Sequence, residues 1–330
     1  MPMKKILITG ANGFLGINLT REFFKLGHQV KIFVRPGADL QGLAGIPVEI
    51  SFGRIDNPGQ VSSAVEGCQI VIHAASITDQ WGVGFEEYER INFKGTKYIV
   101  DACLQHKVER LIHVSTANTI EPGSKKQPAT ELNGFSLFKA NSGYINTKYL
   151  AQQYVLEQVQ ARQLPAIIVN PTFIIGPHDF KPSSGKLLLY GLHKRLLWYP
   201  PGGKNFVYVN DVCQGIINAL DIGKTGSCYL LAGHNLTYRE FFKLLNKISK
   251  EKQLMIRIPA PLLKLAGLMG SLKAIVTRKP GRLTWSAAYL LCLDNYYSGK
   301  KAETELQVKY TPMETSVANA WAWFKENEYC

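Results

Sequence analysis

Four tyrosines in this chain are each followed, four residues later, by a lysine, and such a pair can do acid–base chemistry. Tyr144 and Lys148 lie in the segment SGYINTKYLAQQYV (142–155), and on a helix residues at i and i+4 share a face. A phenol beside an ammonium group can donate a proton near neutral pH. Because chance alone also produces this spacing, the surrounding elements must decide among the four pairs. The rival pairs are Tyr190/Lys194, Tyr296/Lys300 and Tyr297/Lys301.

The first two-thirds of the chain alternate between short apolar, β-branched runs and helical patterns. This alternation predicts an α/β fold with a doubly wound parallel sheet (Rossmann). In such sheets ligands bind beyond the carboxyl ends of the strands. The predicted strands are 5–9, 29–34, 48–51, 70–75, 110–116 and 166–172, and the predicted helices are 14–26, 58–66, 85–106 and 142–162.

After residue 177 the alternation stops in a segment rich in Pro, Gly and aromatic residues. The apolar patterns of residues 206–220 and 227–233 then indicate that the chain returns to the α/β layer. We therefore predict a dinucleotide-binding Rossmann domain (1–177 plus 206–235) with a smaller, discontinuous substrate-binding cap (178–205 plus 236–330).

The segment ITGANGFLG places Gly10, Gly13 and Gly16 between the first strand and its helix. Glycines at this spacing permit a tight turn, a close approach of backbone to pyrophosphate, and close packing of helix on strand. The helix N-terminus then presents N–H groups and the positive end of its dipole to phosphate. Strand, spacing and helix agree, so the segment predicts dinucleotide binding.

The end of the second strand indicates which dinucleotide is preferred. NAD sites usually place an acidic residue there for the ribose 2′-OH, whereas Arg suits the 2′-phosphate of NADP. Here Val34 is followed by Arg35, and Asp39 is the first acidic residue. The sequence favours NADP(H), with NAD(H) as the alternative and a solvated loop position as the ordinary interpretation of Arg35.

The net charge of +13 is concentrated in the cap, since residues 236–282 hold eleven Lys/Arg against two Asp/Glu. No nucleic-acid-binding motif accompanies them. A solvated basic face is the ordinary interpretation, and peripheral membrane contact or an anionic ligand is the alternative. The apolar stretch 259–276 carries Lys264 and Lys273, which favours a packing helix, or else an interfacial one, over a membrane span. Scattered cysteines and the absence of a signal-peptide pattern predict a cytoplasmic protein.

Six motifs in register make the chain resemble the extended short-chain dehydrogenases/reductases of the NAD-dependent epimerase/dehydratase superfamily. Its tail is most similar to the dihydroflavonol-4-reductase and 3β-hydroxysteroid-dehydrogenase branch. The likeness extends through FVYVNDV (206–212). The motifs are the glycine triplet, HAAS (73–76), NFKGT (92–96), HVSTANTI (113–120), Tyr144-x-x-x-Lys148 and NPTFIIGP (170–177).

This resemblance implies roles for particular residues. Tyr144 would be the general acid in ketone reduction and the base in the reverse direction, and Lys148 would lower its pKa and hold the nicotinamide ribose. Thr116, or less readily Ser115, would hydrogen-bond the substrate oxygen, while Asn92 would either support the lysine or organise the backbone. His73 and His113 lie in apolar strands and are interpreted as core residues, and no metal site is expected. The implied cofactor contacts are Gly10, Asn12, Gly13, Phe14, Leu15, Gly16, Arg35, Arg54, Ile55, Ala74, Ala75, Ser76, Ser115, Tyr144, Lys148, Pro171, Thr172 and Ile174.

Two positions depart from the family pattern. Arg54 stands where the family usually has an acid for the adenine amino group, and Glu121 replaces an amide found in the plant flavonol-type enzymes. A plant-flavonoid substrate is therefore not supported. The sequence predicts an NADP(H)-dependent oxidoreductase for a ketone/secondary alcohol pair on a fairly apolar small molecule, and the aromatic and aliphatic cap segment LLLYGLHKRLLWYP (187–200) suggests that the molecule is apolar. The alternatives are an NAD-dependent nucleotide-sugar epimerase/dehydratase and a cofactor-sensing regulator. The resemblance to the family implies a homodimer.

Overall fold

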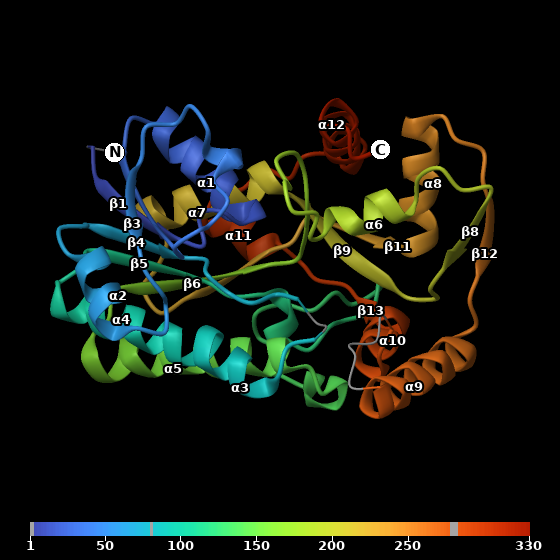
Figure 1. Cartoon of the computed structure of the whole chain (residues 1–330), viewed down its shortest axis with the longest axis horizontal. Coiled ribbons are helices and arrows are strands. Elements are labelled where there is room, and N and C mark those ends of the chain that lie inside the picture. The colour runs from blue at the N-terminus through green and yellow to red at the C-terminus, as the bar shows by residue number, and fades with distance from the viewer. Residues whose placement is uncertain (1–2, 80–81, 278–282) are drawn as a thin grey trace.

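The computed structural model describes residues 3–79, 82–277 and 283–330 (Figure 1). Its largest element is a seven-stranded, wholly parallel sheet with strand order β10-β6-β5-β4-β1-β2-β3. The predicted doubly wound α/β fold is confirmed. The strands are β1 (Lys5–Thr9), β2 (Gln29–Val34), β3 (Glu49–Phe52), β4 (Ile70–His73), β5 (Arg110–Val114), β6 (Ala166–Pro171) and β10 (Cys228–Leu231).

Helices cover both faces of this sheet (Figure 1). On β1, Ile6 and Ile8 enter one hydrophobic core while Leu7 enters the other, because successive side chains of a strand point to opposite faces. Burial on both faces explains why these strands are continuous apolar runs. One face carries α1 (Phe14–Lys25) and α7 (Val209–Ile222); the other carries α2 (Pro58–Val65), α4 (Gly95–Gln105) and α5 (Gly143–Arg162).

The helix predicted over 85–106 is instead three consecutive segments. A π-helix, η2 (Glu89–Lys94), separates α3 (Phe85–Tyr88) from α4. Such widened turns are frequent at functional sites. Here η2 carries Asn92, one of the predicted site residues.

The remaining strands belong to the cap. β7 follows directly after Pro171 and leaves the first sheet to pair in parallel with β9. Strand β9 joins the two halves, because Phe206 enters the cap core and Val207 the core of the first sheet. The second sheet contains β7 (Phe173–Ile175), β9 (Gly203–Tyr208), β11 (His234–Thr237) and β13 (Asp294–Asn295), and a separate parallel pair contains β8 (Leu196–Tyr199) and β12 (Leu254–Arg257).

The predicted domain boundaries stay a prediction, but two segments differ from them. Residues 206–208 of β9 and 234–235 of β11 pair within the second sheet, although the predicted first domain includes 206–235. Conversely, Ala302 and Leu306 of the C-terminal third pack in the first core. The other helices are α6 (Gly185–Tyr190), α8 (Tyr238–Ser249), α9 (Ala260–Thr277), α10 (Trp285–Cys292), α11 (Lys300–Glu305) and α12 (Met313–Glu326).

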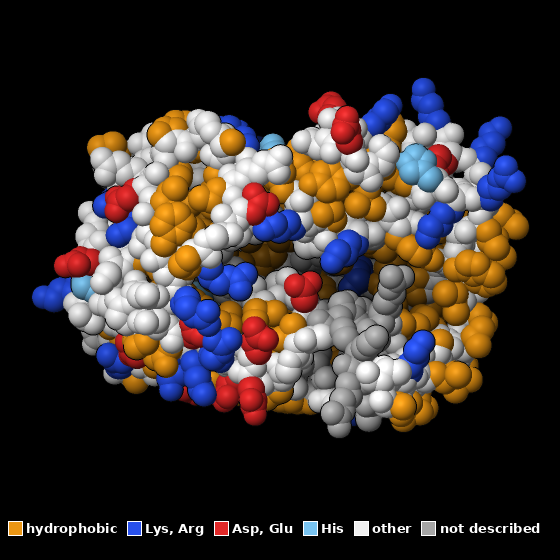
Figure 2. Space-filling view, viewed as in Figure 1, with side chains coloured by type: hydrophobic (Ala, Val, Ile, Leu, Met, Phe, Trp, Pro, Cys, Tyr) orange, Lys and Arg blue, Asp and Glu red, His pale blue; other side chains and the backbone are white. Residues whose placement is uncertain are grey.

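A hollow lies at the centre of the face shown in Figure 2, between the first-sheet half and the cap half. The carboxyl ends of β1, β4, β5 and β6 point toward the cap in Figure 1, as in doubly wound sheets that bind ligands at this edge. Within the described residues, no helix combines the length and the apolar character needed to cross a bilayer.

Candidate active site

The glycine loop leaves no room for side chains at two of its three glycines. Gly10 has φ +69°, and a Cβ there would lie 2.7 Å from the backbone nitrogen of Ala75. A Cβ on Gly16 would lie 2.2 Å from the carbonyl oxygen of Gly10. Gly13 is the N-cap of α1, so the first free N–H groups of the helix face the loop. This cradle fits a pyrophosphate, which needs backbone donors at close range.

A chain of hydrogen bonds fixes the end of β4 against this loop. The Ala75 N–H donates to Oγ1 of Thr9 (3.1 Å), and that hydroxyl lies 2.8 Å from Nδ1 of His73. Nε2 of His73 lies 3.0 Å from the hydroxyl of Thr96, which itself donates to the carbonyl oxygen of Asn92 (2.6 Å). One tautomer satisfies every partner: Nε2 carries the proton and Nδ1 accepts from Thr9.

His73 therefore positions the backbone of Ala74 and Ala75 beside the glycine loop. Burial lowers the pKa of His73 to about 3, with the charge of Lys148 acting in the same direction, so the ring is neutral. The interpretation of His73 as a hydrogen-bonded core residue is confirmed.

Tyr144 and Lys148 lie in the first two turns of α5, whose N-cap Ser142 accepts a hydrogen bond from the N–H of Ile145. The Lys148 ammonium donates to the carbonyl oxygen of Val114, at the end of β5, over 2.7 Å. Burial alone lowers the pKa of this lysine to about 7.

The Tyr144 hydroxyl lies near the side chain of Thr116, two residues beyond β5. The pKa of Tyr144 is raised rather than lowered: burial raises it, Thr116 opposes that shift, and Lys148 does not contribute the lowering that the family resemblance implies. The Thr116 hydroxyl also accepts from the N–H of Asn118 (3.3 Å), which fixes its rotamer. The structure therefore brings together Tyr144, Lys148 and Thr116, whereas the hydroxyl of Ser115 is buried without a partner among the described residues.

Asn92 ties the segment after β4 to α5. Its Oδ1 accepts from the N–H of Ile77 (2.8 Å), and its Nδ2 donates to the carbonyl oxygen of Ile77 (3.1 Å) and to the hydroxyl of Thr147 (3.3 Å). Thr147 immediately precedes Lys148. These contacts organise backbone, and the lysine-supporting role that the family implies for Asn92 stays a prediction.

The segment after β2 forms a tight turn that presents Arg35. The Ala38 N–H donates to the carbonyl oxygen of Arg35 (3.0 Å), and Gly37 has φ +74°, as a turn with Pro36 and Gly37 at its centre requires. Arg35 is exposed, and no residue in the described ranges forms an ion pair with it.

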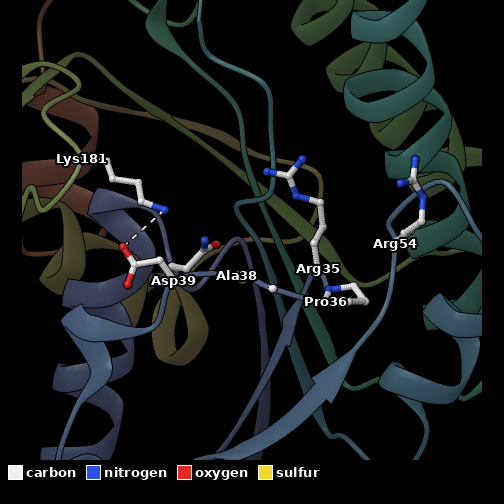
Figure 3. Close-up of a pocket in the computed structure, with 8 residues that line it drawn as sticks. Arg35, Pro36, Ala38, Asp39, Arg54 and Lys181 are labelled. Carbon is white, nitrogen blue, oxygen red and sulfur yellow. Dashed lines mark ion pairs between the residues drawn. The ribbon is translucent and has the colours of Figure 1, made fainter.

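Arg35 lines a hollow of about 470 Å³ that is predominantly cationic (Figure 3). In Figure 3 it stands between Arg54 and the ion pair of Lys181 with Asp39 (3.6 Å). Three cations and one carboxylate line the hollow, and the carboxylate is already paired with Lys181. The other residues lining the hollow are Asn12, Pro36, Gly37 and Ala38.

Arg54 is held by an acidic residue two positions further along the chain. Its guanidinium donates to both carboxylate oxygens of Asp56 (3.1 and 3.0 Å), and Arg90 of η2 also contacts that carboxylate. The family's adenine-binding acid is thus absent at position 54, and the nearby Asp56 is already paired with Arg54 and Arg90. Ile55 is buried in the second core, below this surface.

The remaining predicted cofactor contacts lie along one edge of the sheet. Ala74 and Ser76 follow β4 and are partly exposed, as are Phe14 and Leu15 at the start of α1. Pro171 ends β6, and Thr172 donates from its hydroxyl to Oδ1 of Asn205 (2.7 Å). Ile174 lies in β7 and is partly exposed.

Lys204 is a half-buried cation that the sequence did not single out. Its ammonium lies 5.1 Å from the ring centroid of Phe173, and burial lowers its pKa to about 8. No motif marks a lysine in an irregular glycine-rich segment, so only the fold reveals it. His113 was interpreted correctly as buried, but neither of its ring nitrogens has a hydrogen-bond partner among the described residues.

The three rival Tyr/Lys pairs lie in the cap or the C-terminal third. Tyr190 donates to the carbonyl oxygen of Trp198 (2.8 Å) and stacks under its own Lys194. Tyr297 is buried and donates to the carbonyl oxygen of Ile120 (3.4 Å), and Tyr296 is buried too. These tyrosines serve packing, which leaves Tyr144 as the one of the four that lies at the carboxyl ends of the strands.

The model of the "NAD dependent epimerase/dehydratase family" matches residues 6–232. The Sterol demethylase protein B of Methylococcus capsulatus is 29% identical over 324 residues, 97% of this chain and 98% of that protein. A sterol-4-alpha-carboxylate 3-dehydrogenase of Candida albicans is 25% identical over 98% of this chain and 99% of its own. A solved structure named gox2253 is 30% identical with a TM-score of 0.87, covering 98% of each chain.

Proposed function

The chain belongs to the NAD-dependent epimerase/dehydratase family and is an NAD(P)-dependent oxidoreductase of its extended short-chain type. On that premise we propose that it interconverts a ketone and a secondary alcohol on a fairly apolar small molecule, with NADP(H) as the cofactor. The observation that carries this proposal is the cluster of Tyr144, Lys148 and Thr116 at the carboxyl ends of the strands.

Tyr144 is the general acid in this proposal. When bound, the dinucleotide would supply the hydride that reduces the carbonyl carbon. Tyr144 would give its phenol proton to the carbonyl oxygen, so that the product is a secondary alcohol and the phenol becomes a phenolate. Lys148 is one helical turn away, and its positive charge stabilises the phenolate that remains. The side chain of Thr116 lies near the phenol and is placed to orient the substrate oxygen.

An apolar substrate is supported by the relatives rather than by the cap segment that first suggested it. Leu188, Leu197 and Tyr199 of that segment pack in the cap core. The two relatives named above carry sterol in their names. In addition, the partly exposed side chains of Ile77 and Phe173 follow the strand ends beside the predicted nicotinamide position.

The preference for NADP(H) is supported by the cationic hollow around Arg35. A charge-assisted contact with the 2′-phosphate contributes about 1.5–3 kcal/mol. Arg35→Ser is thus expected to weaken NADPH binding roughly ten- to a hundredfold and leave NADH binding nearly unchanged. Titration of cofactor fluorescence measures both, with Arg162→Ser as the control because Arg162 pairs with Asp101 far from the loop. Equal affinity of the wild-type protein for NADH and NADPH would contradict the assignment.

Substitution of the proposed acid tests the reaction. We expect Tyr144→Phe to abolish NADPH oxidation with ketone substrates and to preserve NADPH affinity, because the phenol acts on the substrate. Tyr190→Phe removes the hydroxyl of a rival pair and should keep full activity. If Tyr144→Phe retains turnover, the acid has been assigned wrongly.

A nucleotide sugar is the second candidate substrate. Arg239, Lys243 and Arg257 line a hollow of about 520 Å³ in the cap, which would suit a diphosphate. An activity screen should therefore hold two arms, ring-containing ketones with NADPH and nucleotide sugars with NAD. Turnover confined to the second arm would replace the ketone proposal.

A further inference from the structure

Helix α9 exposes most of its large apolar side chains to solvent, which is the reverse of the usual arrangement in a helix of a globular protein. Its inward face carries Leu263 and two glycines: a Cβ on Gly267 would lie 2.4 Å from Cβ of Ala288, and one on Gly270 would lie 1.9 Å from the carbonyl oxygen of Leu283. Only glycine fits these positions, so α9 packs closely on α10 through its backbone. Most of the other large apolar side chains of α9 in the described part of the chain are exposed to solvent.

Those outward side chains form a continuous stripe, which we call the docking stripe: Leu262, Leu265, Met269, Leu272 and Val276. Their spacings of three, four, three and four residues place them on one face of the helix. The exposed fractions are 56%, 53%, 63%, 54% and 83%. Contiguous apolar residues at this exposure mark an interaction site rather than a solvated face.

The stripe continues onto the strand pair that precedes it in the chain. Leu196 and Trp198 of β8 and Leu254 of β12 are also exposed, and the register pairs Leu254 with Leu196. Figure 2 shows hydrophobic side chains gathered along the margin of the molecule over β8, β12 and α9. The apolar face thus spans a helix and the adjoining strands.

This face is cationic and free of acidic residues. Residues 252–277 contain four basic side chains (Lys252, Arg257, Lys264 and Lys273) and no Asp or Glu. No ion pair joins any of the four to another residue in the described part of the chain. The partner that covers the stripe must therefore be apolar at its centre and negatively charged at its surface.

We propose that α9, with the outward face of β8 and β12, docks the protein on an anionic lipid bilayer. An amphipathic helix with large apolar residues on one side and flanking Lys/Arg lies in the plane of the interface. A second copy of this chain fits poorly, because a twofold contact would set these cations against each other with no carboxylate from 252–277 to pair them. The proposal does not depend on which substrate the enzyme takes.

Co-sedimentation of the full chain with vesicles tests this docking. We expect binding to phosphatidylcholine vesicles containing phosphatidylglycerol, weak binding to phosphatidylcholine alone, and loss of binding as salt rises. Leu265→Gln/Leu272→Gln should weaken the partition coefficient by at least about tenfold, because each leucine leaves the bilayer. The matched control is Leu26→Gln/Leu132→Gln, which alters two exposed leucines outside the stripe.

Several results would overturn the proposal. One is a wild-type chain that does not sediment with anionic vesicles at low salt, and another is a stripe variant that binds as well as its control. A third is a wild-type chain that does not bind vesicles and is a dimer by light scattering, while the stripe variant is a monomer. In that case the stripe would join two copies of the chain. Circular dichroism melts keep the comparison valid, because exposed leucines can be replaced without unfolding the chain.

Discussion

Lys148→Met is expected to stabilise the protein while abolishing its activity. The side chain is 3% exposed, and its ammonium donates to the carbonyl oxygen of Val114, its one partner among the described residues. Burial lowers its pKa from 10.5 to about 7. One pKa unit corresponds to about 1.4 kcal/mol, so keeping this lysine protonated costs about 5 kcal/mol of folding free energy at pH 7 and below.

The pH dependence follows from which state binds the proton. Between pH 7 and 10.5 the unfolded chain keeps the Lys148 proton and the native chain releases it. The free energy of unfolding of the wild type therefore rises as the pH rises through that window, because the destabilisation by the buried Lys148 proton falls to about 2 kcal/mol at pH 9. Methionine has no such dependence, but it loses the hydrogen bond to Val114, which contributes about 1–2 kcal/mol.

Guanidinium unfolding at two pH values measures the difference. Lys148→Met should be more stable than the wild type by about 3 kcal/mol at pH 6.5 and about equal to it at pH 9. Lys309→Met, at an exposed position, controls for the loss of one positive charge. An equal stability difference at both pH values would refute the reasoning, because the cost would then not come from the buried proton.

Three further predictions test other parts of the site. Gly16→Ala should weaken NADPH binding by at least about tenfold, since its Cβ would lie 2.2 Å from the Gly10 oxygen; Gly84→Ala, with nothing within 4 Å, is the control in the same fluorescence titration. Asn92→Ala should lower the free energy of unfolding by about 1–3 kcal/mol, because the N–H of Ile77 loses its hydrogen-bond partner. Unchanged stability of this variant in thermal unfolding would contradict the structural role of that hydrogen bond. Because the pKa of Lys204 is lowered to about 8, more of its amine is neutral at pH 8 than in a surface lysine. Lys204 should therefore react with acetic anhydride at pH 8 on the order of ten times faster than surface lysines, as measured by mass spectrometry. Modification of Lys204 at the rate of the surface lysines would contradict the lowered pKa.

The parts of the fold that follow local rules were predictable from the sequence. Strands buried on both faces are continuous apolar runs, so β1, β2, β5 and β6 were located to within a residue or two. The glycine triplet was equally readable, because its requirement is steric and belongs to the chain itself. These features depend on neighbours in sequence.

Features that depend on distant neighbours were missed or misplaced. The π-helix that carries Asn92 has no signature in the sequence, and the apolar cap segment around Leu188 suggested a substrate surface although it packs in a core. The same limit applies to α9, since apolar content alone does not say which side faces inward. Gly267 and Gly270 settle that only once α10 is placed against them.

Lys148, which is buried, and Lys204, which is half-buried, connect the cost in stability to the chemistry. Burial lowers the pKa values of Lys148 and Lys204 to about 7 and about 8, and no carboxylate contributes to either shift. A site that holds unpaired cations in a low dielectric is preorganised for negative charge, because stabilising an anion there requires no reorganisation. In the proposed reaction that charge appears on the Tyr144 phenolate, one helical turn from Lys148. The stabilisation expected from Lys148→Met and the loss of turnover expected from the same change therefore have one cause: the uncompensated ammonium that destabilises the folded chain is the group that stabilises the phenolate.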